Sequence, residues 1–409
     1  MNVVMKYGGT SVATTEKIRA VARYVGERRA EGANVVIVAS AMGSSTDRLK
    51  EMADQIGGGA SAREMDCLLA TGEQQTVALL ALALKSLGVD AVSLTGGQCG
   101  FITTSHHTRA RIKRIESSRI KEIIASGAVP VVAGFQGIDE EGNITTLGRG
   151  GSDTTAVALA AALKWDCEIY TDVSGIYTAD PRKVKGAKKL SRITYDEMME
   201  LASLGAGVLE TRSVEIAKKY GVSLFLGKAL ERDLSRGTKI MSERMFEDMP
   251  VTGISGTGNC CTISARGSAS GAWISRMLSL IAGYDISVDT IAMQLTGEDE
   301  CIVSFCCGEE NARELISKIG GEGLPVEIGE KCGLSRVSLV GAGMIARSGV
   351  AAKAFALLTG AGIPFYHITT SEMAISLTVA QPNRDRAMSV LAAGFDLVEN
   401  TDVKGDYIA

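Results

Sequence analysis

Short apolar runs alternate with longer helical patterns along the first half of the chain. Brief runs rich in Val, Ile and Leu predict buried strands at residues 35–38, 91–94, 129–132 and 222–226. Helical spacing between them predicts helices at residues 17–29, 62–87, 119–126 and 154–164. This alternation predicts an α/β fold, a mostly parallel sheet sandwiched by helices, with sites at the carboxyl ends of the strands.

The pattern changes after about residue 249. Strands are predicted at 251–254, 261–264, 287–294 and 301–305 around a helix at 272–282. A second pass places strands at 337–340, 364–369 and 373–379 around a helix at 349–358. Two β-α-β-β passes of about seventy residues each indicate a duplicated ferredoxin-like module. We therefore predict two domains, residues 1–248 and 249–409.

One segment combines a cation, three glycines and a carboxylate where a loop becomes a helix. Thr145 to Ala156 reads Thr-Thr-Leu-Gly-Arg-Gly-Gly-Ser-Asp-Thr-Thr-Ala. Glycines let the backbone approach a ligand, and Ser152 or Asp153 is expected to cap the helix. Free amides at a helix N-terminus stabilise negative charge, so we interpret the segment as an anion site. The alternative is a glycine-rich turn with a solvated arginine.

Two further segments carry polar residues out of apolar runs. Lys6 to Val12 reads Lys-Tyr-Gly-Gly-Thr-Ser-Val and follows a short apolar run, which predicts a second phosphate cradle. Tyr170 to Arg182 reads Tyr-Thr-Asp-Val-Ser-Gly-Ile-Tyr-Thr-Ala-Asp-Pro-Arg, and its polar content favours nucleotide contact over a plain surface loop. Neither glycine segment fits the P-loop or dinucleotide-binding patterns.

Composition bounds the class of protein. The 409 residues are 45% apolar, which is enough for two or three domains with cores of their own. A formal net charge of −4 disfavours a general nucleic-acid binder, so the basic clusters at 109–114 and 183–189 are interpreted as solvated faces. No apolar run approaches the length of a membrane span, and no signal-peptide pattern precedes the first strand. We therefore expect a cytoplasmic protein without membrane partners.

Cysteine and histidine usage bears on metal binding. Nine cysteines without C-x-x-C spacing suit a reducing compartment and are expected to be buried thiols. Only three histidines are present, so a His/Cys metal site is not predicted. His106 and His107 are expected to form a solvated pair on a loop.

At the three polar segments the chain resembles the aspartate kinases of the amino acid kinase family. Their signatures read Lys-Phe-Gly-Gly-Thr-Ser-Val, Gly-Arg-Gly-Gly-Ser-Asp and Thr-Asp-Val-x-Gly-Ile-Tyr-Thr-Ala-Asp-Pro-Arg, and the match covers essentially the whole length. The resemblance implies an amino acid kinase fold followed by two intertwined βαββαβ modules of the ACT type. It implies ATP-dependent phosphorylation of the L-aspartate side chain to 4-phospho-L-aspartate, the first step towards lysine, threonine and methionine.

The resemblance also implies roles for individual residues. Lys6 would contact the transferring phosphoryl group, and Asp153 would orient Lys6. Arg149 would clamp the α-carboxylate of the substrate through two parallel donors, and Glu73 would receive its ammonium group. The implied members of the acceptor pocket are Thr46, Glu73, Arg149 and Ser152. The implied ATP contacts are Lys6, Gly8, Gly9, Thr171, Asp172, Tyr177 and Arg182.

Phosphorylation of a carboxylate needs positive charge and positioning more than a strong base. The acceptor is already a nucleophile near neutral pH, and the obstacle is to bring anions together in line. Fixed cations and oriented donors supply this. Mg²⁺ is expected on the phosphates of ATP with few protein ligands, because it keeps waters and bridges phosphate oxygens. No dedicated metal-binding residue is predicted.

The chain departs from the family pattern in three places. Gly205 to Thr211 reads Gly-Ala-Gly-Val-Leu-Glu-Thr where many members read Gly-Ala-Lys-Val-Leu-His-Pro. A common cationic contact to ATP is therefore missing, and Arg182 or another lysine is expected to compensate. Arg266 to Ala272 replaces an Asp-Lys-Pro-Gly turn, and Pro364 to His367 replaces a frequent Asn-Ile-Gln-Met. We therefore expect inhibition by lysine or threonine to be weakened or altered.

Two other functions stay open. The first is an amino acid kinase acting on glutamate or an acetylated derivative, although an acetylated amine would offer no ammonium group for Glu73. The second is a decayed ACT-type amino acid sensor, although the joint presence of Lys6, Arg149 and Asp153 argues against decay. An amino acid effector is expected at the ACT modules. These modules also predict a homodimer, with a homotetramer as the second option.

Overall fold

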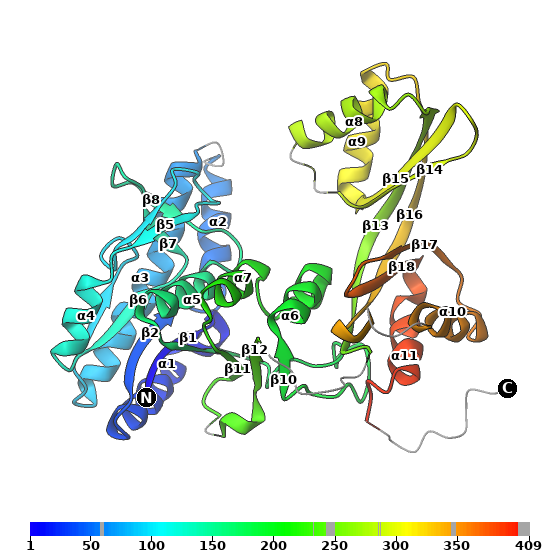
Figure 1. Cartoon of the computed structure of the whole chain (residues 1–409). Coiled ribbons are helices and arrows are strands. Elements are labelled where there is room, and N and C mark those ends of the chain that lie inside the picture. Colours follow the sequence, from blue (N-terminus) through cyan, green and yellow to red (C-terminus); the bar gives the residue numbers. More distant parts are fainter. Residues whose placement is uncertain are drawn as a thin grey trace. The chain divides into compact units, whose positions relative to one another are not determined.

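The computed structural model describes residues 1–57, 61–231, 233–242, 250–284, 286, 288–344 and 349–399 and divides the chain into two units (Figure 1). The first unit comprises Met1–Ile176, Lys189–Ala202 and Gly207–Phe246. The second comprises Tyr177–Lys188, Ser203–Ala206 and Glu247–Ala409. The predicted domain boundary between residues 248 and 249 lies outside the described residues.

A largely parallel sheet forms the core of the first unit. Its order is β10-β12-β11-β9-β1-β2-β6-β3, and each neighbouring pair is parallel except β11 with β12. The strands are β1 Asn2–Tyr7, β2 Asn34–Ala39, β3 Ala91–Leu94, β6 Val129–Ala133, β9 Asp166–Thr171, β10 Arg192–Thr194, β11 Leu224–Lys228 and β12 Thr238–Met241. The predicted α/β class with a mostly parallel sheet is confirmed.

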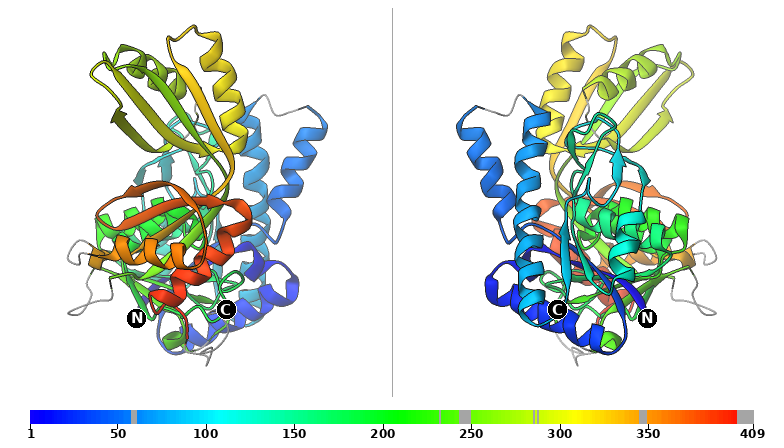
Figure 2. Two further views of the ribbon diagram at one scale, coloured as in Figure 1. Left: turned by 90° about the vertical axis from the view of Figure 1, so that its right-hand side faces the viewer. Right: turned by 90° about the vertical axis from the view of Figure 1, so that its left-hand side faces the viewer.

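Helices cover both faces of this sheet (Figure 1). They are α1 Thr15–Ala30, α2 Ser45–Gln55, α3 Ala62–Ser86, α4 Ser118–Ala125, α5 Gly151–Leu163, α6 Tyr195–Leu201 and α7 Thr211–Tyr220. In both views of Figure 2 the dark blue helix is α1, and the lighter blue helices are α2 and α3, which pack against each other. Alternation along β1 turns Val3, Met5 and Tyr7 into the core formed with α1 and α3. Lys6 consequently points to the opposite face, where α5 packs on β1 and β9.

Among the boundaries that differ from the sequence-based expectation are the starts of β11 and α5. Strand β11 begins two residues later than predicted, because Val222 still belongs to the turn after α7 and donates its N–H to the Ala217 carbonyl. Helix α5 begins earlier, at Gly151, with Gly150 in the left-handed region at φ 63° as its N-cap residue and no side-chain cap. The expected capping by Ser152 or Asp153 is therefore wrong, since both lie inside the first turn of the helix.

The first unit also contains a small second sheet. Its order is β5-β4-β7-β8, from β4 Phe101–Thr103, β5 Ile112–Ile115, β7 Gln136–Ile138 and β8 Ile144–Thr146. The last of these strands ends shortly before the glycine-rich segment that leads into α5. The small sheet therefore fixes where that segment starts.

The expectation that no apolar run approaches the length of a membrane span is wrong for helix α3. By length and composition alone its 25 residues could cross a membrane, and 44% of the apolar window is buried within the described residues. It packs against α1, β3, β6 and β8, as a core helix does. Buried acidic residues at Asp66 and Glu73 interrupt its apolar face.

The second unit is built on one antiparallel sheet. Its order is β14-β15-β13-β16-β18-β17, from β13 Gly253–Ser268, β14 Asp289–Leu295, β15 Glu300–Gly308, β16 Glu327–Val340, β17 Phe365–Thr370 and β18 Ala374–Ala380. Its helices are α8 Ala272–Gly283, α9 Glu309–Gly321, α10 Val350–Gly360 and α11 Arg384–Gly394. The long strands β13 and β16 serve both halves, and α8 with α9 and α10 with α11 form two separate cores. The predicted pair of ferredoxin-like modules is confirmed, and α9 and α11 are additional to the predicted elements.

Residues 177–188 belong to the second unit. The Thr178 carbonyl accepts a hydrogen bond from Ile254 N at 2.6 Å, and its hydroxyl donates to the Leu397 carbonyl at 2.5 Å. Val184 and Ala187 are buried in the core that α10 and α11 form. The described structure thus anchors this segment beside elements far away in the sequence.

One expectation about cysteine is corrected in the second unit. Cys261 on β13 and Cys332 on the neighbouring strand β16 are joined by a disulfide, so these two are not free thiols. The other seven cysteines, all within the described residues, take no part in a disulfide, and most of them are buried.

Candidate active site

The carboxyl ends of four adjacent parallel strands define one edge of the first unit. Beyond these ends, Ser40 N donates to the Tyr7 carbonyl at 3.1 Å and Gly134 N donates to the Ala39 carbonyl at 3.0 Å. Gly8 N likewise donates to the Tyr170 carbonyl at 3.0 Å. The loops after β1, β2, β6 and β9 therefore start side by side at this edge, where ligands of open α/β sheets bind.

A buried ion pair lies at this edge. Lys6, the second-last residue of β1, places its ammonium nitrogen 2.5 Å from the Asp153 Oδ1 atom in the first turn of α5. Each residue is only 8% exposed, so the two charges compensate each other in a poorly solvated environment. The pair restricts where the amino group of Lys6 points.

The loops after β1 and β2 approach each other very closely. A Cβ atom on Gly9 would lie 2.7 Å from the Ala41 carbonyl oxygen, a contact that only glycine avoids. Gly43 N donates to the Gly9 carbonyl at 3.0 Å and holds the two loops together. The half-buried Thr46 follows in the first turn of α2. A Cβ on Gly8 would lie 3.6 Å from the Lys6 ammonium, so the turn also stays close to the ion pair.

Glu73 reaches the same loops from helix α3. Its side chain is buried, with 3% of the residue exposed, and its Oε1 accepts a hydrogen bond from Ala41 N at 3.1 Å. Its Oε2 has no hydrogen-bond partner among the described residues. Burial raises the pKa of Glu73 to about 7, and the Ala41 N–H opposes this shift. A buried carboxylate with one free oxygen is suited to receive an ammonium group.

The glycine-rich segment wraps around the start of α5. Gly148 and Gly150 have φ values of 81° and 63°, a backbone conformation that favours glycine. Arg149 between them is exposed, whereas Ser152 is 8% exposed. A Cβ on Gly134 would lie 2.8 Å from the Ser152 Cβ, so the loop after β6 contacts the first turn of the helix.

The predicted nucleotide contacts divide between the two units. Thr171 ends β9 in the first unit, and its hydroxyl donates to the exposed Asp172 carboxylate at 2.9 Å. Tyr177 and Arg182 belong to the second unit. There the Arg182 guanidinium bonds both oxygens of Asp180 at 3.0 Å. Gly207, where the family cation is missing, has a φ of 57°.

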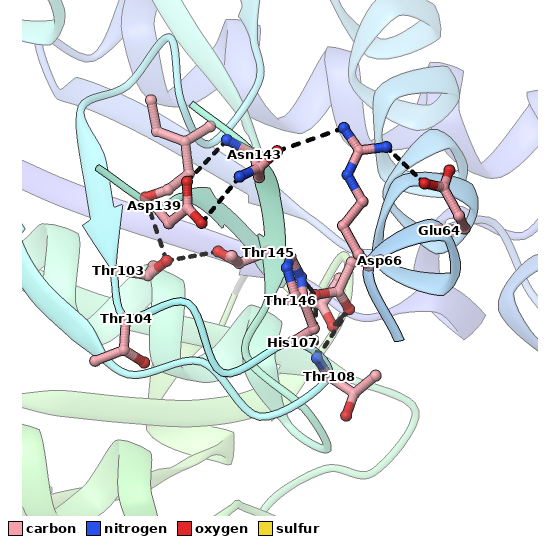
Figure 3. A network of polar contacts seen from close by, with 12 residues as sticks. Glu64, Asp66, Thr103, Thr104, His107, Thr108, Asp139, Asn143, Thr145 and Thr146 are labelled. Atoms are coloured by element: carbon pink, nitrogen blue, oxygen red, sulfur yellow. Dashed lines mark hydrogen bonds and ion pairs between the residues drawn. The ribbon is translucent and has the colours of Figure 1, made fainter. Parts of the chain in front are cut away.

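One polar network was missed from the sequence. The Asp66 carboxylate on α3 is fully buried and accepts hydrogen bonds from Thr146, Thr108 and His107 (Figure 3). The expectation of a solvated histidine pair is therefore wrong for His107, although His106 is exposed. A signal was present, because Asp66 lies seven residues before Glu73 and so on the same helix face.

A surface groove of the first unit does not coincide with the predicted site. It has a volume of about 850 Å³ and is lined mainly by the basic strand β5 and by α7, and it contains none of the predicted site residues. Among the described residues, no group of three or more His, Cys, Asp or Glu side chains could hold a metal ion. The site is defined by the strand ends and their loops.

Comparisons with known proteins agree with this geometry. Residues 1–228 match the model of the amino acid kinase family, and residues 337–395 match that of the ACT domain. The chain is 44% identical over 401 residues to an aspartokinase of Bacillus sp. strain MGA3, covering 97% of both chains. The structure resembles E. coli aspartokinase III in complex with aspartate and ADP, with a TM-score of 0.77, 22% identity, and 96% and 99% of the two chains covered. It also resembles aspartate kinase from Synechocystis, with a TM-score of 0.54, 39% identity, and 98% and 71% covered.

Proposed function

The chain belongs to the aspartate kinases of the amino acid kinase family, and on that premise we propose how its own residues carry out the reaction. The enzyme transfers a phosphoryl group from ATP to the side-chain carboxylate of L-aspartate and forms 4-phospho-L-aspartate, the first step of the aspartate pathway. A glutamate-type kinase and a non-catalytic sensor are not favoured, because the named aspartokinases match along nearly the whole chain. We assign catalysis to residues 1–248 and regulation by two intertwined ACT domains to residues 249–409.

In this proposal Lys6 neutralises charge on the phosphoryl group during transfer. The observation that carries it is the buried pair of Lys6 with Asp153, because a lysine fixed at the strand ends presents its charge in one place. The attacking carboxylate is already ionised near neutral pH, so no base is needed. Gly8 and Gly9 bring backbone close to the phosphates, as their short contacts allow.

The acceptor pocket recognises L-aspartate by its two backbone charges. Glu73 receives the ammonium group through the oxygen that has no partner in the described structure. Arg149 binds the α-carboxylate with two parallel N–H donors. Thr46 and Ser152 complete the pocket with hydroxyl groups. An acetylated amine has no charge for Glu73 to bind, so the pocket disfavours acetylated acceptors.

The nucleotide is bound by Thr171, Asp172, Tyr177 and Arg182. Mg²⁺ accompanies ATP and is held mainly by phosphate oxygens and waters. When bound, the ion neutralises phosphate charge and orients the γ-phosphoryl group. Gly207 stands where many family members carry a lysine that contacts ATP. Arg182, or a lysine elsewhere in the chain, supplies the positive charge that is missing at this position.

The ACT region binds an amino acid effector, with a response to lysine or threonine that is weakened or altered. Pro364 stands at the position of the frequent Asn, and Phe365, at the position of the Ile that follows, stacks on Phe355 with ring centroids 5.2 Å apart. Proline lacks the polar side chain of asparagine, so an effector loses a hydrogen-bond partner there. Inhibition curves with lysine and threonine, separately and together, test this, and full inhibition at ordinary effector concentrations contradicts it. We further propose a cytoplasmic homodimer or homotetramer that assembles through the ACT domains.

A product-trapping assay tests the catalytic proposal. Purified protein is incubated with MgATP and L-aspartate, L-glutamate or N-acetylglutamate, while hydroxylamine traps any acyl phosphate and a coupled assay follows ADP. Aspartyl hydroxamate is expected with wild type, and Lys6→Ala is expected to lower its formation about a hundredfold or more. Lys85→Ala, which removes an exposed lysine at the end of α3, is the control and should match wild type. Full activity of Lys6→Ala overturns the role of Lys6.

A further inference from the structure

A fully buried carboxylate gathers donors from two separate segments of the first unit. Asp66 on α3 is 0% exposed. Its Oδ2 lies 2.8 Å from His107 Nδ1, and its Oδ1 accepts from the Thr146 hydroxyl at 2.5 Å. Both oxygens lie 3.0 Å from Thr108 N. Figure 3 shows these side chains converging on Asp66. In this contact we assign the N–H of the imidazole to His107 Nδ1, with the carboxylate oxygen as acceptor.

Those donors flank the segment that carries Arg149. His107 and Thr108 lie between β4 and β5, and Thr146 is the last residue of β8. Three residues after Thr146, the chain reaches the arginine. Ala110 N donates to the Thr146 carbonyl at 2.9 Å, and a Cβ on Gly148 would lie 3.1 Å from the Thr108 carbonyl oxygen. The loop at 107–110 therefore forms one side of the Arg149 segment.

The same segments are tied from other directions. The Arg212 guanidinium on α7 donates to the Leu147 carbonyl and to the Ala110 carbonyl, both at 3.2 Å. The Thr103 and Thr145 hydroxyls pair at 2.6 Å and connect β4 to β8, as Figure 3 also shows. Thr108 has a φ of 65°, a backbone conformation that a threonine rarely adopts without outside support. The hydrogen bonds that Thr108 N donates to the Asp66 carboxylate supply that support.

Helix α3 connects this network to the acceptor pocket. Asp66 and Glu73 are seven residues apart, so they lie on one face of the helix about 10 Å apart along its axis. Between them, the Ala70 carbonyl accepts from the Gln136 side chain at 2.9 Å. One rigid helix therefore bonds the loop after β2 through Glu73 and the neighbours of the Arg149 segment through Asp66.

We propose that Asp66 and His107 are positioning residues for substrate recognition. Through Thr108 and Thr146 they hold the Arg149 segment at a fixed distance from Glu73, which sets the spacing between the groups that bind the α-carboxylate and the ammonium of L-aspartate. This inference rests on the proposed roles of Arg149 and Glu73. Neither positioning residue touches substrate, so the effect falls on the affinity for the amino acid and leaves the affinity for the nucleotide unchanged.

The neighbouring histidines provide a matched pair of variants. His107→Ala removes the donor to Asp66 and is expected to raise KM for L-aspartate about tenfold, with KM for MgATP within about twofold of wild type. His106→Ala changes an exposed neighbour and is expected to leave both constants unchanged. His107→Asn keeps an N–H close to the position of Nδ1–H and is expected to recover most of the loss. Thr146→Val, which removes the second side-chain donor, is expected to act like His107→Ala.

The outcomes separate this inference from the proposed function. If wild type forms no aspartyl hydroxamate, the proposed function fails before the variants are compared. If wild type is active and His107→Ala raises both KM values equally, or changes neither, the positioning role is overturned. If His107→Ala does not fold, His107→Asn and Thr146→Val decide by the same ratio of KM values. Recovery by Asn of the melting temperature without recovery of KM for L-aspartate also overturns the positioning role.

Discussion

Replacing Glu73 by Gln removes one buried negative charge while preserving the size of the side chain and the acceptor used by Ala41 N. Burial raises the pKa of Glu73 from 4.5 to about 7 in the folded protein. Below both values the group is neutral in the folded and unfolded states and contributes nothing. Between them the folded state holds more protons than the unfolded state, so stability falls as the pH rises. Above about pH 7 the full destabilisation from the buried charge is present.

The size of this effect follows from the shift. A rise from 4.5 to about 7 corresponds to about 3 kcal/mol at high pH. Of this, about 2 to 3 kcal/mol develops between about pH 5 and pH 8. The pH dependence of all other groups cancels when the two proteins are compared at each pH. The Glu73→Gln variant is therefore expected to gain that amount over wild type across this interval, whatever constant offset its amide introduces.

The two tryptophans of the chain make the measurement specific to the first unit. Trp165 lies in the first unit and Trp273 in the second, so a Trp273→Phe background leaves fluorescence from the first unit alone. Urea unfolding in this background, with and without Glu73→Gln, gives the difference in free energy of unfolding at each pH. If the difference in free energy of unfolding between the two proteins stays constant from about pH 5 to pH 8, Glu73 does not have a raised pKa in the folded protein.

The catalytic activity of wild type is expected to rise with pH over the same interval in which its stability falls. Binding of the substrate ammonium needs the ionised form of Glu73, so kcat/KM for L-aspartate in wild type should fall below a pKa of about 7. At saturating MgATP, Glu73→Gln should lack this acidic limb and be about a hundredfold less active at high pH, because a charge-assisted bond is lost. An unchanged acidic limb in the variant assigns the limb to another group.

Three further predictions concern single residues of the first unit. Arg149→Lys is expected to raise KM for L-aspartate about tenfold with little change for MgATP, since one ammonium replaces two parallel donors; equal changes in initial-rate kinetics argue against the clamp. Gly207→Lys puts a side chain at φ 57° and is expected to lower the free energy of unfolding by about 1 kcal/mol. If the apparent affinity of this variant for ATP is unchanged, the nucleotide site needs no positive charge at position 207. Glu168→Gln leaves Arg28, now bonded at 3.1 Å, without its buried partner and is expected to destabilise by about 3 kcal/mol in urea; a negligible loss would indicate that water solvates the arginine.

The sequence alone predicted most elements of the first unit and the residue types that the candidate site contains. Apolar runs flanked by helical patterns located β2, β3 and β6, because a strand buried on both faces needs apolar residues throughout. Anion binding was indicated by the glycines and charged residues that follow the predicted strands. These are Lys6, Gly148 to Asp153, and Thr171 with Asp172. The change of pattern after residue 249 likewise indicated the duplicated modules.

Only the tertiary structure decided which residues meet. The distance between Lys6 and Asp153 depends on α5 crossing β1, and nothing local to either residue specifies that contact. The raised pKa of Glu73 comes from the packing of α3, and the partly buried position of His107 comes with a partner 41 residues away in the sequence. Residues 177–188 carry a signature of the kinase sequence and yet pack in the second unit. Burial and partner choice are properties of the assembled chain, because they arise from contacts between segments that are distant in sequence.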